Sequence, residues 1–175
     1  GDPFRAKVAQ AEEAAARGQT KTAVALLAEA ERLAPQENMH KFLAQAFDFL
    51  IRIKELPAAR QYYERLKKAN VDALNGQSFE ARLLYAEGKY PEAINKCRAV
   101  LRVRGADSST RRILARALLE SGAGTAKEVE NELRQALKDS PTDRDCWHDL
   151  INLLLETGQE QAAWSEAAVA RARLP

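Results

Sequence analysis

Single glycines recur along this chain of 175 residues at an interval near 34 residues, and this spacing limits the folds open to it. Each glycine follows one apolar helical pattern and precedes the next; the four are Gly18, Gly88, Gly122 and Gly158. Their separations are 70, 34 and 36 residues, so the first gap spans two intervals, with Lys54 where a glycine is expected. A fixed period of about 20 to 50 residues is the sequence signature of repeat architectures. The spacing therefore predicts five copies of one structural unit.

A second set of positions keeps the same period. Five residues after Gly18, Lys54, Gly88 and Gly158, the chain carries an alanine: Ala23, Ala59, Ala93 and Ala163. In the remaining unit a two-residue insertion follows Gly122, and Val129 takes the place of the alanine. Small side chains there let two helices approach closely, and a helix-breaking residue twelve positions further on closes four of the units: Pro35, Gly105, Pro141 and Pro175. The alternative is an irregular bundle whose alanine-rich helices imitate a period by chance.

The apolar spacing predicts two helices in each unit and no strand. In the third unit, apolar residues three and four apart mark one buried face per helix: Ala81, Leu84, Tyr85, Ile94, Cys97 and Leu101. Pro57 and Pro91, 34 residues apart, suit the first turn of a second helix, where a missing N–H costs nothing. The ten predicted helices run near Phe4–Arg17, Lys21–Leu33, Asn38–Lys54, Pro57–Lys68, Asn75–Glu87, Pro91–Arg104, Ser108–Ser121, Ala126–Asp139, Asp143–Thr157 and Glu160–Arg173.

These positions together resemble the tetratricopeptide repeat (TPR), a helix-turn-helix unit of about 34 residues, over essentially the whole chain. The clearest copies are Glu87-Gly88-Lys89-Tyr90-Pro91-Glu92-Ala93 and the last unit, with Trp147, Leu150, Leu154, Gly158, Ala163 and Pro175 at the positions of the pattern. Lys54, Val129 and Ile151 depart from it. The resemblance implies an all-α fold, a right-handed superhelical solenoid of about five helix-turn-helix repeats.

The period also predicts the domain organisation. We expect one TPR-like domain over residues 1–175, with repeats at about 4–37, 38–73, 74–107, 108–143 and 144–175. Repeat arrays need polar caps, because an end repeat otherwise exposes an apolar face. The last unit has no polar capping helix, and Leu153, Trp164 and Val169 are the candidates for an exposed face. We therefore expect a piece of a longer array, or an end covered by a partner or by self-association.

The sequence offers few residues in arrangements that catalysis requires. His40 and His148 are the only histidines, and neither has cysteines or carboxylates at a metal-ligand spacing. Cys97 lies in an apolar stripe and is predicted to be buried, whereas Cys146, beside Trp147, is expected to be partly exposed and Trp147 to lie in the core. The glycines are single, so they do not form a phosphate loop. The sequence thus predicts no enzyme, no cofactor and no metal.

Charge narrows the range of partners. With 27 basic and 25 acidic residues the net charge is only +2, too balanced to imply wholesale binding to nucleic acid or membranes. Residues 51–106 carry twelve basic and six acidic residues, a net +6, which raises RNA binding as a hypothesis. RNA binding is disfavoured because no aromatic residues alternate with the arginines to stack on bases. We expect no direct membrane insertion, and two cysteines suit the cytoplasm but do not exclude the bacterial periplasm.

The resemblance implies a binding groove lined by the first helix of each pair. Its groove positions hold Glu12 and Asp48 in the first two units and, as the candidate partner-binding set, Arg82, Tyr85, Arg112, Arg116, His148 and Asn152. The three arginines would favour a protein or peptide partner with an acidic segment, unless they are solvated residues paired with acids such as Glu80 and Glu120. The leading hypothesis is a non-enzymatic protein-interaction adaptor. The alternative is a scaffold or spacer in a bacterial envelope or polysaccharide-export assembly.

Overall fold

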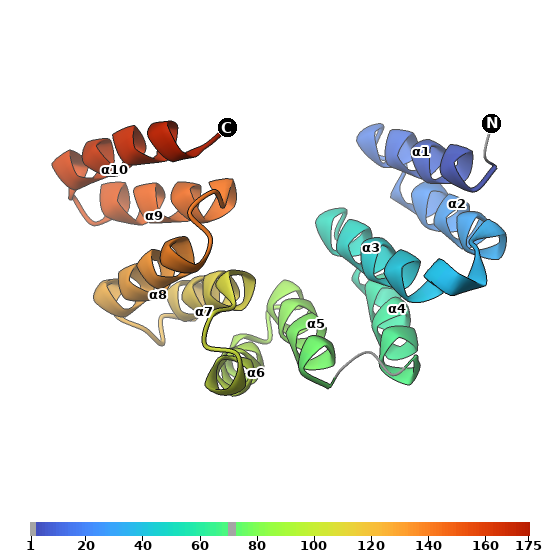
Figure 1. The fold of residues 1–175 in the computed structure, drawn as a ribbon, viewed down its shortest axis with the longest axis horizontal. Coiled ribbons are helices and arrows are strands. Elements are labelled where there is room, and N and C mark those ends of the chain that lie inside the picture. The colour runs from blue at the N-terminus through green and yellow to red at the C-terminus, as the bar shows by residue number, and fades with distance from the viewer. Residues whose placement is uncertain (1–2, 70–72) are drawn as a thin grey trace. The chain divides into compact units, whose positions relative to one another are not determined.

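The computed structural model describes residues 3–69 and 73–175, and within these residues every regular element is helical (Figure 1). The elements are α1 (Pro3–Ala16), α2 (Thr20–Leu33), the 3₁₀ turn η1 (Gln36–Asn38), α3 (Met39–Arg52), α4 (Leu56–Lys68), α5 (Ala73–Ala86), α6 (Tyr90–Val103), α7 (Ser108–Ser121), α8 (Ala126–Asp139), α9 (Arg144–Glu156) and α10 (Glu160–Arg173). Ten predicted helices are thus confirmed, with ends that differ by a few residues. Val71, which stands twelve residues after Ala59 where the other units have a helix-breaking residue, lies outside the described residues.

The periodic glycines end the first helix of four pairs in the left-handed conformation. Their φ angles lie between 68° and 75°, and Lys54 has a φ of 62° in the equivalent place. At Gly18 and Lys54 the next N–H donates to a carbonyl five residues back, from Gln19 to Ala14 at 2.9 Å and from Glu55 to Leu50 at 3.0 Å. This bond is the main closure of a Schellman turn. The substitution of lysine for glycine therefore changes the residue but not the turn.

Lys54→Gly is expected to raise the free energy of unfolding by about 0.5 to 1 kcal/mol. A left-handed conformation costs a residue with a Cβ roughly 1 to 2 kcal/mol, and the greater freedom of glycine in the unfolded chain offsets part of that gain. Gly88→Ala is the matched reverse change, because φ is 75° there and an added Cβ would meet no atom within 4 Å. Urea unfolding of both variants measures the effect. A destabilised Lys54→Gly protein would contradict the strain at this turn.

The predicted contact positions between paired helices are buried. Ala23, Ala59 and Ala93 have no exposed surface, Ala163 is 2% exposed and Val129 is 1% exposed. In the fourth pair the longer connection begins its second helix with a capping box, in which Thr125 and Glu128 satisfy each other's backbone N–H groups. The insertion after Gly122 is thus accommodated without exposing Val129.

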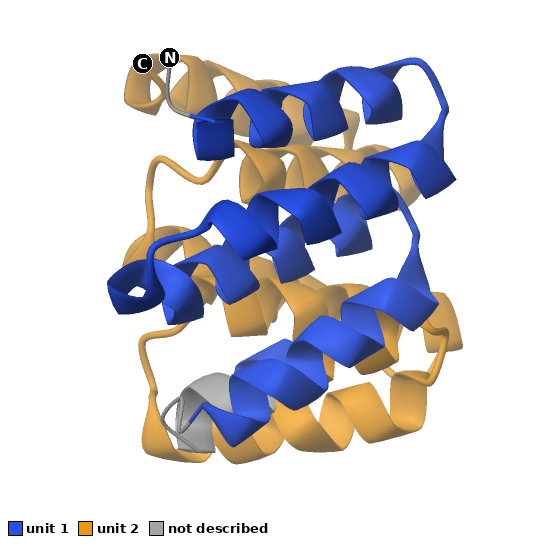
Figure 2. Cartoon of the chain, turned by 90° about the vertical axis from the view of Figure 1, so that its right-hand side faces the viewer, with its two compact units in different colours: residues 1–79 blue, residues 80–175 orange. Residues whose placement is uncertain are grey.

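The chain divides into two compact units, residues 1–79 and 80–175 (Figure 2). The core of unit 1 is rich in aromatic side chains, with Phe42 in edge-to-face contact with Phe4 at 5.7 Å and with Tyr62 at 6.5 Å between ring centroids. The core of unit 2 is mainly aliphatic and runs from Ala81 on α5 to Ala170 on α10. The repeat boundaries and the longer array stay predictions.

Ion pairs join second helices of neighbouring pairs within each unit. In unit 1, Arg65 on α4 pairs with Glu31 on α2. In unit 2, Arg134 on α8 contacts Glu166 on α10 at 2.5 Å, and it also contacts Glu130 on its own helix at 2.8 Å. The two contacts between helices link residues 34 and 32 positions apart, close to one repeat. In each unit they connect one helix pair to the next.

Three predicted side-chain positions are wrong. Cys146 is fully buried rather than partly exposed, because Asp143 caps α9 and turns the thiol toward the Leu133 carbonyl of α8, 3.4 Å away. Leu153 is 3% exposed, packed within the core of unit 2 instead of on an open face. Leu83, not Leu84, is the fully buried leucine of α5.

Other expectations of burial are confirmed. Cys97 has no exposed surface and Trp147 is 7% exposed, with its indole N–H bonded to the Pro141 carbonyl at 2.9 Å. Trp164 is 73% exposed and Val169 is 42% exposed, both on α10. Within the described residues, no helix combines the length and apolar character needed to cross a bilayer.

Candidate functional site

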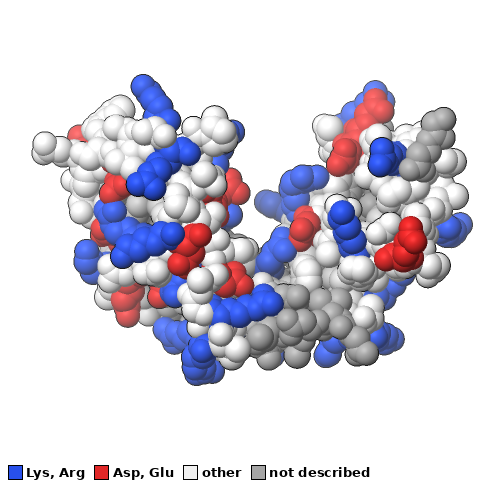
Figure 3. Space-filling view, in the orientation of Figure 1, with Lys and Arg blue, Asp and Glu red and all other residues white. Residues whose placement is uncertain are grey.

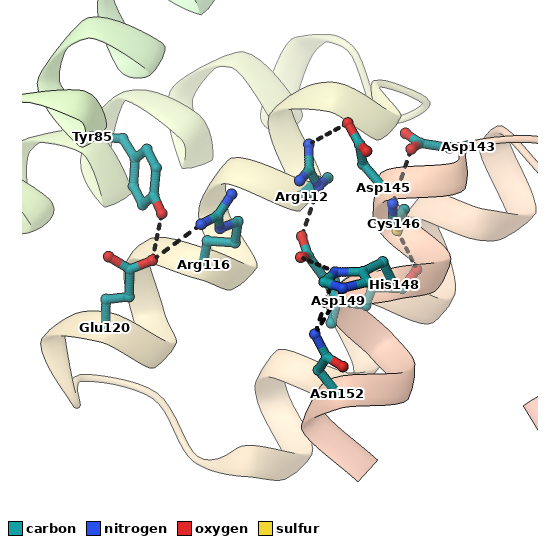
Figure 4. A network of polar contacts seen from close by, with 11 residues as sticks. Tyr85, Arg112, Arg116, Glu120, Asp143, Asp145, Cys146, His148, Asp149 and Asn152 are labelled. Carbon is teal, nitrogen blue, oxygen red and sulfur yellow. Dashed lines mark hydrogen bonds and ion pairs between the residues drawn. The ribbon is translucent and has the colours of Figure 1, made fainter. Parts of the chain in front are cut away.

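All six candidate partner-binding residues lie on first helices of unit 2, two on each helix. Arg82 and Tyr85 belong to α5, Arg112 and Arg116 to α7, and His148 and Asn152 to α9; we call this surface the first-helix face. Figure 4 shows all of them but Arg82, in two separate groups of polar contacts, one around Glu120 and one around Asp149. Arg82 is half-buried, three residues before Tyr85 on α5.

A cluster around Glu120 joins α5 to α7. The Tyr85 hydroxyl donates to one carboxylate oxygen of Glu120 at 2.5 Å, and the Tyr90 hydroxyl donates to the other at 2.8 Å. Arg116 lies 3.5 Å from the same carboxylate, with its guanidinium carbon 5.3 Å from the centre of the Tyr85 ring (Figure 4). A cation over an aromatic face is attracted by the ring quadrupole. The cluster therefore holds three side chains in fixed positions around one carboxylate.

The same contacts set the protonation of these groups. Burial alone would raise the pKa of Glu120, but hydrogen bonds from Tyr85 and Tyr90 and the charge of Arg116 bring it below its ordinary value. Burial, followed by the bond to Glu120, raises the pKa of Tyr85 well above its ordinary value. Glu120 is thus ionised and Tyr85 is a neutral donor at neutral pH.

Arg112 connects α7 to α9 through two carboxylates. Its Nε donates to Asp149 at 2.7 Å, and its Nη1 lies 3.4 Å from Asp145 (Figure 4). Burial would lower the pKa of this guanidinium, but the Asp149 hydrogen bond and the nearby aspartates raise it overall. Arg112 is 25% exposed and Asp149 is 18% exposed, so the pair is partly desolvated.

The arginines of the first-helix face are therefore not a bare basic centre. Arg112 is balanced by Asp145 and Asp149, and Arg116 by Glu120, as the paired interpretation of these arginines requires. Glu80, the other acid suggested as a partner, pairs with Lys96 on α6 at 3.1 Å instead. Over the face of unit 2 in view, Figure 3 shows basic and acidic side chains intermixed rather than gathered by sign.

A small pocket opens between α7 and α9 beside these groups. It has a volume of about 150 Å³ and an apolar wall that includes Leu119 and Leu153, with Arg116, Glu120, Asp149 and Asn152 around it. Leu119 is 43% exposed. Asn152 also contacts His148 one turn earlier at 3.2 Å, and the His148 side chain is 73% exposed. The pocket thus offers apolar surface and hydrogen-bonding groups together.

Sequence reasoning missed Tyr90, Glu120 as a shared acceptor, Asp145 and Asp149. Asp145 and Asp149 are four residues apart on α9, a spacing that places them on one helical face, so a signal for them existed. In the sequence, Tyr90 was identified only as a residue of the turn motif and not as a residue of the site. Its contact with Glu120 spans 30 residues and depends on how α6 packs against α7.

The two thiols are poorly suited to nucleophilic chemistry. Burial, with a smaller contribution from Asp107, raises the pKa of Cys97 to about 12. Burial, together with Asp143 and Asp149, raises the pKa of Cys146 to about 12. The thiolate is the nucleophile, so both groups are inert at neutral pH. Across residues 3–69 and 73–175, no three metal-binding side chains lie close enough to hold an ion.

Comparison with known proteins rests on solved structures, since no family model and no curated protein matches the chain. TTC0263, a thermophilic TPR protein from Thermus thermophilus, has a TM-score of 0.71 at 16% identity, over 97% of this chain and 91% of that one. MamA from Desulfovibrio magneticus RS-1 has a TM-score of 0.58 at 16% identity, over 98% of this chain and 95% of that one.

A third neighbour is YrrB, described as a TPR protein with an unusual peptide-binding site. It has a TM-score of 0.54 at 12% identity, over 94% of this chain and 82% of that one. Identities this low establish the fold alone. The chain has the all-α, TPR-type helical repeat fold that its glycine and alanine spacing predicts.

Proposed function

We propose that this chain is a non-enzymatic protein-interaction module and that the first-helix face of unit 2 holds a peptide or domain of its partner. The residues that carry the proposal are Arg82, Tyr85, Arg112, Arg116, His148 and Asn152. YrrB, which has the same fold, has a peptide-binding site. The inert thiols agree with a role in binding rather than chemistry.

One observation supports this face above the others: its polar side chains are already fixed by one another while their outer surfaces remain open. Arg116 is 41% exposed and Glu120 is 39% exposed, yet both belong to the cluster with Tyr85 and Tyr90. Binding to groups that are already ordered loses little side-chain entropy. A partner would meet a prepared surface rather than a flexible one.

The pocket between α7 and α9 suggests how a partner is held. At about 150 Å³ it suits one apolar side chain against Leu119. The Asn152 amide and the exposed His148 ring lie beside it and can bond to a partner's backbone. The apolar contact would provide affinity, and the polar groups would select the register of the bound segment.

The acidic character of the partner stays a prediction. A partner carboxylate at Arg116 would have to share the guanidinium with Glu120, since Arg has five N–H donors and can bond to two acceptors. The gain from such a wet, shared contact is small and falls with salt. Hydrogen bonding and the apolar pocket are therefore expected to contribute more than net charge.

The test uses a partner captured from the source organism with the wild-type chain and then purified. Arg116→Ala and Asn152→Ala are each expected to weaken its binding roughly three- to tenfold, which corresponds to about 0.5 to 1.5 kcal/mol per lost hydrogen bond. Matched controls are Arg171→Ala on α10 and Asn95→Ala on α6, both exposed. Calorimetric titration gives the affinities. If the four variants bind alike, the first-helix face is not the binding surface.

The scaffold alternative draws on a different surface. Trp164 and Val169 expose apolar side chains on α10, which favours contact with another protein surface. A structural role or self-association through this end would use that contact. Substitution of Arg116 or Asn152 would then leave the association unchanged. The four variants therefore also separate the two functions.

A further inference from the structure

A second groove lies in unit 2 between α6 and α8, with α7 beneath it. Its volume is about 510 Å³, and leucines from α6 and α7 form its floor: Leu101, Leu114 and Leu118. Arg98 and Arg102 form the α6 side, and Glu128, Asn131 and Glu132 form the α8 side. We call this surface the α6–α8 groove. Nothing in the proposed function uses it.

The arginines of this groove differ from those of the first-helix face. Arg98 and Arg102 are exposed and stand four residues apart, so they project from the same side of α6. Among the described residues neither makes an ion pair or a hydrogen bond, although the charge of Arg98 contributes to lowering the pKa of Glu128 across the groove. Arg112 and Arg116 of the first-helix face contact carboxylates, as does Arg111, the third arginine that lines the groove. The α6–α8 groove therefore presents two guanidinium groups, Arg98 and Arg102, that have no carboxylate partner among the described residues.

The acidic side of the groove is already occupied. Glu132 accepts from Arg111 at 2.9 Å, and Glu128 accepts from the Thr125 N–H at 2.7 Å in the capping box of α8. These carboxylates are held by their own partners, whereas the two arginines opposite are not. Of the charged side chains that line the groove, three are arginines and two are glutamates, so the net charge of its lining is positive.

The two surfaces of unit 2 lie on opposite sides of α7. Leu114 and Leu118 face the α6–α8 groove, whereas Arg112 and Arg116 belong to the first-helix face. With 3.6 residues per turn, these two pairs project in nearly opposite directions. A ligand in one site leaves the other open.

We propose that the α6–α8 groove binds an acidic, amphipathic segment of a protein partner. The apolar side of the segment packs on the leucine floor, and its carboxylates bond to Arg98 and Arg102, which suit bidentate recognition. Nucleic acid fits less well, because the residues that line the groove include no aromatic ring on which a base could stack. This site does not depend on the proposed function of the first-helix face.

The probe is a fluorescein-labelled peptide of about four helical turns, built from leucine and glutamate so that a helix is apolar on one side and acidic beside it. Fluorescence anisotropy at low salt measures its binding to the full chain. The double variant Arg98→Ala/Arg102→Ala is expected to bind at least about tenfold more weakly, from the loss of two charge-assisted hydrogen bonds. The matched control is Arg144→Ala/Arg171→Ala, which removes two exposed arginines elsewhere in unit 2 and should bind as the wild type does.

Two further peptides test the acidic and the apolar contact separately, and one further variant tests which of the two surfaces the peptide uses. Lysine in place of glutamate should abolish binding, and serine in place of leucine should weaken it, because each removes one of the two contacts. Arg116→Ala should leave the affinity unchanged.

The proposal is overturned if the acidic peptide does not bind, if both double variants bind it equally, or if only Arg116→Ala weakens it. It is also overturned if a single-stranded uridine oligomer binds more tightly than the peptide and depends on Arg98 and Arg102. That result would assign the groove to RNA.

Discussion

Phe47→Ala is expected to lower the free energy of unfolding by about 3 to 5 kcal/mol, the usual range for removing a fully buried aromatic ring. Phe47 has no exposed surface, and its ring meets that of Phe79 edge to face at 5.2 Å between centroids. The substitution removes apolar burial, leaves a cavity and breaks the aromatic contact from α3 to α5. Urea unfolding followed by circular dichroism measures the loss.

Trp164→Ala is the matched control for this change. Trp164 is also a large aromatic residue on a helix, but it is 73% exposed, so its removal should change the free energy of unfolding by no more than about 0.5 kcal/mol. A similar loss in both variants would mean that Trp164 is covered in solution. A small loss for Phe47→Ala would contradict the position of α3 in the core of unit 1.

Ala93→Leu is expected to cost about 1 to 3 kcal/mol by overpacking. Ala93 lies on α6 with no exposed surface, at the position where the repeat pattern places a small residue between paired helices. Three additional carbon atoms fit there only if α5 and α6 move apart. The midpoint of denaturant unfolding reports the effect.

Lys89→Leu serves as the comparison for Ala93→Leu. Lys89 is exposed four residues earlier, at the start of the same helix, so the substitution places the same leucine side chain in solvent. Its effect should stay within roughly 0.5 kcal/mol. Equal midpoints for the two variants would contradict the register that puts Ala93 between helices.

The fold could be predicted because its determinants are local and repeated. A turn glycine, an alanine five residues later and a breaker at the end of the unit occur together in three of the five units, and the other two units keep part of this pattern. Lys54 shows that the turn does not depend on a single residue. It adopts a φ of 62°, although a residue with a Cβ disfavours this left-handed conformation. The neighbouring helices determine the turn, and one unfavourable residue does not change it.

Individual side-chain orientations were harder to predict. Leu83 and Leu84 are adjacent leucines, and the spacing of apolar residues alone is compatible with burial of either one. Cys146 was misjudged because its direction depends on the Asp143 cap and on the position of α8. A one-residue rotation of a helix moves a side chain by about 100°, enough to exchange buried and exposed positions.

The candidate site was predicted in part. The first-helix positions of Tyr85, Arg112 and Arg116 follow from the repeat pattern, and the structure brings Tyr85 and Arg116 together at Glu120 while Arg112 pairs with aspartates of α9. Their charge partners did not follow from it, because Asp149 contacts Arg112 across 37 residues and Tyr85 contacts Glu120 across 35. Such pairs depend on packing between repeats, which a local pattern does not encode.

The central claim, that the first-helix face of unit 2 holds a protein partner, can be tested on the two histidines of the chain. His148 lies on that face with its side chain 73% exposed, and His40 is exposed on α3 in unit 1. Diethyl pyrocarbonate modifies accessible imidazoles, and mass spectrometry measures the rate at each position with and without the captured partner. The account predicts that the partner slows modification of His148 severalfold and leaves His40 unchanged. An unchanged rate at His148 in the saturated complex would contradict it.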